Sequence, residues 1–343
     1  MPRLNCPKVA GRVLTRGGGH LLEKSDLGLR GFDLQSTRGL ALKLNTHMNA
    51  TSTNTAHSAR GSIVDRDRIC QAIGGYGSLF AGRVDEAPDT TTDAYAADQE
   101  TVNARRVIEY LVPLAKLVGA RTVLDVGCGV GEMVRTFLGL GYDAYGVDLP
   151  GLHRHWSRLG LPHDQMFIVD PARLRLPFVA DSVDFAFTLG VIEHVGTSDG
   201  MADRVVDYDA IRKEWLREVF RVVRPGGAML IAGPNRRFPV DVAHGLDSRA
   251  SATERWLSAK LKASVHKTWG ENFLWSYGDV ERYLHGLPHR TDPQPIAGFL
   301  ACSRVPGVVR PAVQAYIDHL PRALLGTGFN PWVMALVHKP ASA

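Results

Sequence analysis

The sequence predicts a doubly wound α/β fold with a mostly parallel sheet, and three observations support this prediction. From about Thr101 onward, short apolar runs of strand length alternate with segments of helical periodicity. A glycine-rich turn, "VGCGVGE", joins the first apolar run to the helical segment after it. The 343-residue chain is 45% hydrophobic and 22% charged, a composition typical of a globular domain with a large core.

The basic character of the chain belongs to its first 60 residues. They contain nine Lys or Arg against three Asp or Glu, whereas the rest of the chain has 31 against 32. Small polar stretches such as "MNATSTNTAHSARGS" predict a disordered extension over residues 1–60. It is either an organelle presequence or a dispensable extension before an alternative start at Met48, and we favour the second. The near-neutral remainder argues against a nucleic-acid partner.

The cysteines and the hydropathy pattern predict a cytoplasmic protein. Cys6, Cys70, Cys128 and Cys302 lie far apart and form no CxxC pair, which indicates free thiols in a reducing compartment. No apolar run approaches the roughly 18 residues of a membrane-spanning helix.

Helical periodicity dominates the segment before the glycine turn. "ETVNARRVIEYLVPLAKLV" places its apolar residues on one helical face, with a kink expected at Pro113. We therefore assign residues 61–118 to a helical N-terminal region. Three aromatic residues of this region, which belong either to a cap over a ligand or to the core, are Tyr76, Phe80 and Tyr95.

Five buried strands are expected along the rest of the fold, and they lie at residues 121–126, 143–147, 165–169, 183–188 and 228–233. Between the last two strands, "YDAIRKEWLREVFRVV" has the apolar stripe of a helix. We expect Pro225-Gly226-Gly227 to stop that helix. Strand and helix thus alternate as in a parallel sheet covered on both faces.

The glycine turn does not fit the common phosphate-binding patterns. Gly127, Gly129 and Gly131 are followed by Glu132, which stands where a dinucleotide fingerprint has its third glycine. A carboxylate there would repel a pyrophosphate. No Gly-Lys-Ser/Thr follows, so a nucleotide phosphate loop is excluded as well.

Three aspartates at successive strand ends indicate a different ligand. Asp125 precedes the turn and suits a cationic group, and Asp148 is placed to accept hydrogen bonds from both hydroxyls of a ribose. Asp170 ends the third strand, where a side chain can meet an adenine edge. An amino acid end, a ribose and an adenine together describe S-adenosylmethionine. Any one of these acids alone could be an ordinary helix cap.

The motifs "VLDVGCGVGEMV", "GVDL", "IVDPARLRLPF", "DSVDFAFTLGVIEHV" and "LREVFRVVRPGGAMLIAGPN" resemble those of class I S-adenosylmethionine-dependent methyltransferases. The resemblance covers residues 100–235 and a closing strand at 332–339. It implies a seven-stranded sheet whose last strand is antiparallel. It also implies a cap over the cofactor at 61–118 and a methyltransferase domain at 119–343, with a substrate-side insertion at 234–325.

The resemblance also implies a set of cofactor-binding residues. Asp125, Gly127 and Gly129 would line the methionine end, Asp148 the ribose and Asp170 the adenine, with Leu189 offering backbone. The full set of expected cofactor-binding residues is Asp125, Gly127, Gly129, Gly131, Asp148, Leu149, Asp170 and Leu189. Cys128 is interpreted as a small buried filler.

Two groups of residues are candidates for removing a proton from the methyl acceptor. Glu193 and His194 follow the fourth strand, where the competing interpretation, a structural or cofactor-orienting role, is favoured. Asp241 and His244 lie in "GPNRRFPVDVAHG" after the fifth strand, where the competing interpretation is an ordered loop with an Asx turn at Asn235 and solvent-facing arginines. His153, His155 and His163 lack the spacing of a metal site, and no metal is expected.

Residues 234–283 resemble an insertion of bacterial methyltransferases that act on polysaccharides, glycolipids or secondary metabolites. Its helix has an apolar face of Trp256, Leu257, Leu261 and Val265, for which we favour packing over a role as lid or lipid contact. Arg173 and Arg175 could face an anionic partner, although arginines beside a loop are usually solvated.

The predicted function is methyl transfer to a small-molecule, glycan or lipid-linked acceptor, preferably at oxygen. The alternatives are a nucleic-acid or protein methyltransferase, a non-catalytic S-adenosylmethionine-binding protein, and a nicotinamide dehydrogenase, which Glu132 opposes. Monomer and homodimer both stay open.

Overall fold

The structure is a computed structural model, and it describes residues 62–83, 99, 102–171, 175–198, 203–241, 246, 250–261, 264–265, 274–300 and 308–341. The chain divides into two units, Met1–Gly61 and Ser62–Ala343, and all the described residues belong to the second. The predicted extension at residues 1–60 lies outside the described residues, as do Tyr95, Arg173 and His244.

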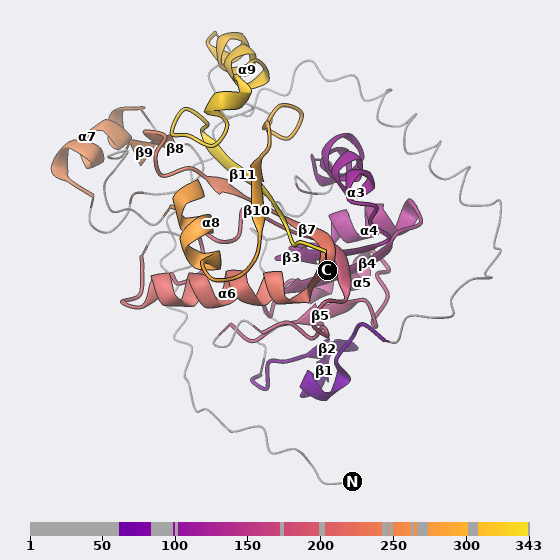
Figure 1. Ribbon diagram of the computed structural model, residues 1–343. Coiled ribbons are helices and arrows are strands. Elements are labelled where there is room, and N and C mark those ends of the chain that lie inside the picture. Colours follow the sequence, from indigo (N-terminus) through magenta and orange to yellow (C-terminus); the bar gives the residue numbers. More distant parts are fainter. Residues whose placement is uncertain are drawn as a thin grey trace. The chain divides into compact units, whose positions relative to one another are not determined.

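A nine-stranded sheet forms the centre of the second unit, in the order β1-β2-β5-β4-β3-β6-β7-β11-β10 (Figure 1). Its pairings are parallel from β2 through β7, whereas β1, β11 and β10 pair antiparallel with their neighbours. The predicted mostly parallel sheet with an antiparallel final strand is thereby confirmed. The strands are β1 Gln71–Ile73, β2 Tyr76–Ser78, β3 Thr122–Val126, β4 Asp143–Asp148, β5 Met166–Ile168, β6 Val183–Leu189, β7 Val223–Pro234, β10 Arg290–Pro293 and β11 Trp332–His338.

Two strands at the β5 edge raise the count from the expected seven to nine. They form the hairpin β1–β2, whose turn residues Gly74 and Gly75 have φ of 57° and 88°. Glycine adopts such angles without a steric penalty, so this pair makes a tight hairpin turn. The expectation of helix throughout residues 61–118 is therefore wrong for this segment, where Gly77 pairs with Phe167 of β5.

Helices cover both faces of the sheet. One apolar cluster joins α6 and α8 to one face, and a second joins η2, α3, α4, α5 and α9 to the other. Figure 1 shows α6 and α8 lying side by side, away from α3 and α4. The helices are η1 Arg66–Arg68, η2 Val107–Leu111, α3 Val112–Leu117, α4 Glu132–Gly139, α5 His153–Arg158, α6 Tyr208–Val222, α7 Ala252–Leu261, α8 Tyr277–Leu284, α9 Arg310–Asp318 and η3 Arg322–Leu324.

Three local expectations have different outcomes. Pro113 lies where π-helical η2 gives way to α3, which has the proline in its first turn. The helix α6 ends before Pro225, and β7 runs through Pro225-Gly226-Gly227. A register shift between β6 and β7 and a φ of 75° at Gly226 let the strand pass this segment, so the expected stop signal lies inside the strand. Tyr76 is buried against Trp156, with ring centroids 5.2 Å apart, and belongs to the core.

The segment 234–325 contains less insertion than expected. The helix α8 packs into the core and β10 pairs with β11, so both belong to the main fold. Strands β8 Val240–Asp241 and β9 Ser264–Val265 form a separate two-stranded sheet beside α7. Among its described residues α7 buries none, and Trp256 and Leu261 are 60% and 62% exposed. The expected packing of this face is therefore wrong for these side chains, while the side chain of Val265 lies outside the described part.

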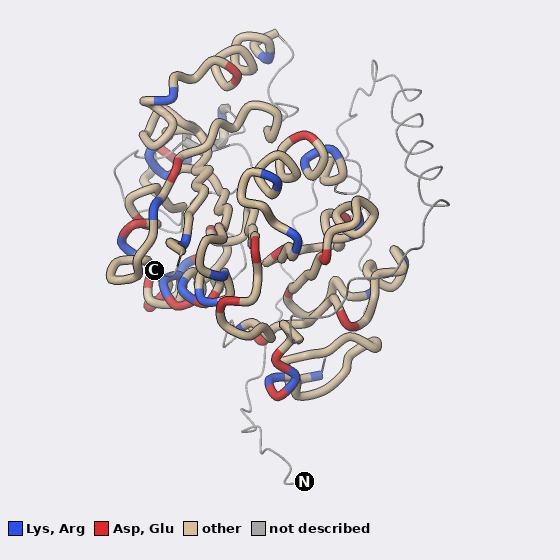
Figure 2. The backbone as a smooth tube through the Cα atoms, turned by 45° about the vertical axis from the view of Figure 1, so that its right-hand side comes forward, with Lys and Arg blue, Asp and Glu red and all other residues tan. Residues whose placement is uncertain are grey.

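Charged residues of both signs are mixed along the chain. Basic and acidic residues are interspersed along the described chain in Figure 2. Within the part that the structure describes, no helix combines the length and hydropathy that crossing a membrane requires.

Candidate functional site

The glycine turn lies directly after β3 and is closed by backbone hydrogen bonds. The amides of Gly127 and Cys128 donate to the carbonyl of Val147 at 2.9 and 3.0 Å, and Gly131 donates to Cys128 at 2.9 Å. Gly127, Gly129 and Gly131 have φ of 86°, 55° and 86°, a region that L side chains rarely adopt. The three glycines are therefore required by the path of the chain.

The surroundings of the three glycines differ. A Cβ on Gly127 would lie 2.4 Å from a methyl group of Val191, and one on Gly131 would lie 2.4 Å from a methyl group of Leu161. A Cβ on Gly129 would meet nothing within 4 Å. Gly127 and Gly131 thus allow close packing within the protein, whereas Gly129 borders open space that a ligand could enter.

Asp148 ends β4 and fastens the turn. Its carboxylate accepts hydrogen bonds from the amides of Gly129 at 2.5 Å and Leu149 at 2.6 Å. Burial of the carboxyl raises its pKa to about 6, although the two donors act in the opposite direction. The position of Asp148 beside the turn could be predicted from the sequence, whereas these two hydrogen bonds could not.

Asp125 lies next to Asp148 on the neighbouring strand. It is 4% exposed, and burial, together with the negative charge of Asp148, raises its pKa well above the usual value. Burial and the same two acids also raise the pKa of the Cys128 thiol, which fits an inert filler. Two close acids in a low-dielectric site are complementary to a cationic ligand.

The register of the sheet brings Asp170 and Leu189 to the same edge. Asp125 pairs with Phe187 of β6, and Leu189 follows Phe187 by two residues at the carboxyl end of that strand. Asp148 pairs with Ile168 of β5, and Asp170 lies two residues further on and is half-buried. Ligands of doubly wound sheets bind at this carboxyl edge.

Glu132 begins α4 and is almost fully buried. Its carboxylate forms an ion pair with Arg135, whose guanidinium lies 2.6 and 2.8 Å from the two oxygens. The N-terminus of α4 is thus already supplied with a negative charge. A pyrophosphate at this helix N-terminus would lie against the buried Glu132 carboxylate, which is electrostatically unfavourable.

Glu193 and His194 lie in the turn after β6 and differ in burial. Glu193 is 0% exposed, and its Oε2 would lie 2.8 Å from a Cβ on Gly233 of β7. His194 is half-buried, and its carbonyl accepts a hydrogen bond from the Thr197 hydroxyl at 2.6 Å. Val191 of the same turn packs on Gly127, so this turn adjoins the glycine turn.

Arg212 of α6 binds the backbone of this turn, and this role could not be predicted from the sequence. It is 1% exposed, and its guanidinium donates to the carbonyls of Glu193 at 2.8 Å and Val195 at 2.9 Å. Burial lowers the pKa of Arg212, while the charges of Tyr283 and Glu193 oppose that shift. No sequence signal separates this arginine from the solvated ones on the same helix.

The second candidate group is structural at its described residues. Asn235 accepts a hydrogen bond from the amide of Arg237 at 3.0 Å, which confirms the Asx turn. Its side-chain amide donates to the carbonyls of Thr327 and Asn330. Arg237 is exposed, and Arg236 lies 3.5 Å from Asp279. Asp241 is described only by its backbone in β8, and His244 lies outside the described residues.

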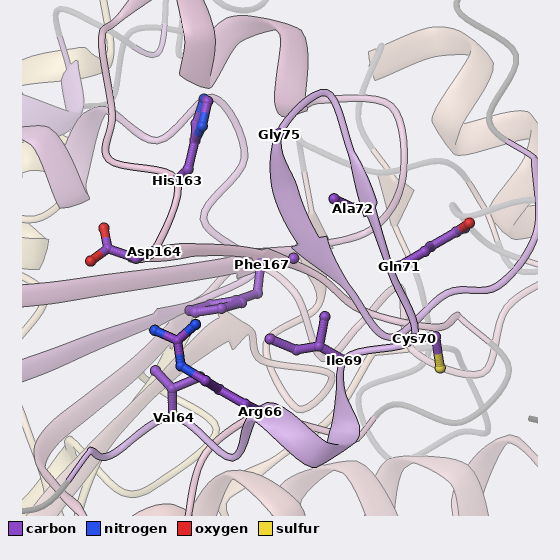
Figure 3. Close-up of a pocket in the computed structure, with 11 residues that line it drawn as sticks. Val64, Arg66, Ile69, Cys70, Gln71, Ala72, Gly75, His163, Asp164 and Phe167 are labelled. Atoms are coloured by element: carbon purple, nitrogen blue, oxygen red, sulfur yellow. The ribbon is translucent and has the colours of Figure 1, made fainter. Parts of the chain in front are cut away.

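A cavity of 440 Å³ lies beside the β1–β2 hairpin, where Figure 3 shows residues from η1, the hairpin and the segment before β5. Its lining includes His163 and Asp164, which precede the amino end of β5. The candidate cofactor residues follow the carboxyl ends of the strands, so this cavity is separate from them. Among the residues that the structure describes, no three or more His, Cys, Asp or Glu side chains are grouped to hold a metal.

The chain matches the family of methyltransferase domains over residues 95–281 and belongs to this family. It is a class I S-adenosylmethionine-dependent methyltransferase domain, and S-adenosylmethionine is its cofactor. Asp125, Asp148 and the open side of Gly129 fit that cofactor, because its sulfonium and ammonium are cationic and its ribose offers hydroxyls.

Individual relatives match shorter parts of the chain. A probable S-adenosylmethionine-dependent methyltransferase of Mycolicibacterium smegmatis is 30% identical over 36% of this chain and 42% of its own length. A probable pectin methyltransferase of Arabidopsis thaliana is 29% identical over 43% of this chain and 23% of its own length. The chain thus spans less than half of either relative. A solved S-adenosylmethionine-dependent methyltransferase of Clostridium acetobutylicum has 12% identity and a TM-score of 0.33, covering 43% of this chain and 59% of the other.

Proposed function

We propose that the protein transfers a methyl group from S-adenosylmethionine to an oxygen atom of a small-molecule, glycan or lipid-linked acceptor. The main observation behind this proposal is the meeting of three acids, the open glycine and His194 near one edge of the sheet. His194 is the histidine of this set, and histidine is the most frequent general base in enzymes.

The cofactor supplies a methyl group on a positively charged sulfur. In the proposal, Asp125 faces the cationic methionine end, with the backbone of Gly129 alongside. Asp148 and Leu149 hold the ribose, and Asp170 meets the adenine amino group. Gly127 and Gly131 act through packing, because protein side chains occupy the space next to them. Leu189 offers its backbone at the end of β6.

His194 is the proposed general base for the acceptor hydroxyl, since oxygen acceptors have to lose a proton during methyl transfer. Glu193 is buried against β7 and is therefore assigned to positioning the turn, together with Arg212. Asp241 and His244 remain the second proposed acid–base pair. The name of the relative from Arabidopsis, a pectin methyltransferase, supports a glycan acceptor.

Cofactor binding is expected to weaken in mild acid. Because the pKa of Asp148 is about 6, its carboxylate is mostly ionised at pH 7 and mostly protonated at pH 5. The dissociation constant of S-adenosylhomocysteine should therefore rise about tenfold from about pH 7 to about pH 5, measured by isothermal titration calorimetry. The raised pKa of Asp125 acts in the same direction.

Asp148→Asn provides the control for this pH dependence, because the amide does not titrate. Its dissociation constant should vary less with pH than that of the wild type. A wild-type affinity that stays constant down to about pH 5 would contradict an ionised Asp148 in the complex.

His194→Ala tests the proposed base. We expect turnover to fall about 100-fold or more, because a positioned general base contributes about 10²–10⁴-fold. Affinity for S-adenosylhomocysteine should stay within about twofold, since His194 has no proposed contact with the cofactor. His285→Ala, an exposed histidine after α8, serves as the matched control and should retain turnover. Equal turnover in the two variants would assign His194 a structural role.

Transfer of radiolabelled methyl groups into a lysate of the encoding organism tests the function as a whole. Products are separated into lipid, glycan, small-molecule, protein and nucleic-acid fractions, with Asp148→Ala as the blank. Label in one of the first three fractions, absent from the blank, supports the proposal. Label in protein or nucleic acid would overturn the acceptor class. Cofactor binding without label in any fraction would favour a binding protein.

A further inference from the structure

A cleft of 480 Å³ lies along the outer side of α6, beside η1 and the segment at Arg175. It opens on the side of α6 away from the core. Its lining is dominated by charged side chains and consists of Arg68, Arg175, Ala210, Lys213, Glu214, Arg217, Glu218 and Arg221. None of these residues belongs to the proposed cofactor or acceptor site.

The cleft has an excess of positive charge. Five basic side chains line the cleft together with two acidic ones, and Asp65, which lies 2.8 Å from Arg68, adds a third negative charge, so the net charge is +2. Glu218 is already engaged, because Arg221 lies 2.7 Å and Arg68 3.2 Å from its carboxylate, and the Leu176 amide donates to it at 2.9 Å. Although burial opposes the shift, these donors hold the pKa of Glu218 below its usual value. The negative charge of Glu218 is therefore paired with Arg68 and Arg221.

The remaining cations are available to a ligand. Arg175 and Lys213 are exposed and form no ion pair with a described acid. Arg217 donates to the carbonyls of Tyr283 at 2.8 Å and His285 at 2.5 Å, so its positive charge is not neutralised by a carboxylate. Glu214 alone opposes these three cations inside the cleft.

We propose that this cleft binds a small ligand carrying a diphosphate group. A diphosphate carries about three negative charges near neutral pH, so it can engage Arg175, Lys213 and Arg217 together. Arginine presents several N–H donors in a planar fork that suits phosphate oxygens. The volume of 480 Å³ lies in the range of small-molecule sites, about 300–1,000 Å³. A single carboxylate would leave most of these cations unmatched.

Calorimetric titration of the full-length protein with inorganic pyrophosphate tests the proposal. The wild type should bind with a dissociation constant below about 1 mM. In the double variant Arg175→Glu/Lys213→Glu it should rise at least about tenfold, because two attractive charges become repulsive. Both replaced side chains are exposed, so the fold and the affinity for S-adenosylhomocysteine should be unchanged.

Arg105→Glu/Lys116→Glu is the matched control. It changes the net charge by the same amount on exposed positions of the helical segment that packs on the opposite face of the sheet. Pyrophosphate affinity should match that of the wild type. An equal loss of pyrophosphate affinity in both double variants would show that only the net charge of the protein matters, and it would overturn the proposal.

Inorganic phosphate distinguishes a diphosphate site from a site for any anion. It should bind at least about tenfold more weakly than pyrophosphate, since it carries fewer charges and reaches fewer of the three available cations. Equal affinities, or no binding of pyrophosphate at all, would overturn the assignment. Because neither titration uses the methyl donor, these outcomes are independent of the proposed methyl transfer.

Discussion

Replacing Asp148 by alanine is expected to raise the dissociation constant of S-adenosylhomocysteine about 5- to 150-fold, the equivalent of about 1–3 kcal/mol. The variant loses a carboxylate proposed to accept hydrogen bonds from the ribose. It also loses the acceptor for the amides of Gly129 and Leu149, so the open side of the glycine turn becomes less ordered. Both effects weaken the bound state.

Asp143→Ala is a control from the same strand. Asp143 begins β4 and Asp148 ends it, so the two aspartates lie at opposite ends of the same strand. Affinity for S-adenosylhomocysteine should be unchanged in Asp143→Ala. Circular dichroism and thermal melting establish that each variant is folded. Unchanged affinity in a folded Asp148→Ala protein would contradict the proposed ribose contact.

Much of the sheet could be predicted because its strands are short, apolar and separated by helices. The expected strand at 143–147 agrees with β4, and that at 183–188 agrees with β6, to within one residue at either end. Burial on both faces makes such strands continuously apolar, which is a strong local signal. Parallel pairing then places their carboxyl ends at one edge, so the meeting of Asp125 with Asp148 could also be expected.

The failures arise where tertiary contacts override local pattern. Gly74 and Gly75 form a hairpin turn, but the strands on either side have three residues each, too short for a periodicity signal. The helix α6 ends before Pro225 as expected, but the strand expected at 228–233 already begins at Val223, because Val223 pairs with Val183 of β6. Helical periodicity in α7 predicted a packed face, which the described residues do not show.

Within the site, the sequence distinguishes residue types but not their surroundings. All three glycines of the turn have the same expected role, yet only Gly129 borders open space. Trp156, whose indole donates to the carbonyl of Gly129 at 2.7 Å, comes from α5 and has no motif. Arg212 likewise follows an ordinary helical pattern. Such contacts depend on how elements distant in the sequence pack together, so no local sequence pattern predicts them.

Arg212→Met is expected to lower the free energy of unfolding by about 3–6 kcal/mol, because it removes two buried hydrogen bonds from a charged group, each of about 1.5–3 kcal/mol. Methionine has a similar length but donates no hydrogen bonds. The carbonyls of Glu193 and Val195 would each lose a charged donor in a site that is 1% exposed. The cation that favours the buried Glu193 carboxylate is lost as well. Chemical denaturation followed by circular dichroism measures the change.

Arg217→Met isolates the effect of burial, because the two arginines lie on one helix and bond in the same way. Arg217 also donates to two carbonyls, those of Tyr283 and His285, but it is half-exposed. Water can replace its hydrogen bonds, so we expect a loss of only about 1 kcal/mol. Similar losses of unfolding free energy in the two variants would show that burial does not increase the contribution of Arg212 to stability.

Arg212→Lys separates charge from geometry. Lysine keeps the positive charge, but its single ammonium cannot reproduce the planar fork that spans two carbonyls. Its stability should therefore lie between those of the wild type and Arg212→Met. If the fork also fixes the turn that contains His194, the lysine variant should bind S-adenosylhomocysteine normally yet turn over more slowly, as His194→Ala does. Full turnover in Arg212→Lys would instead confine this arginine to stabilising the fold.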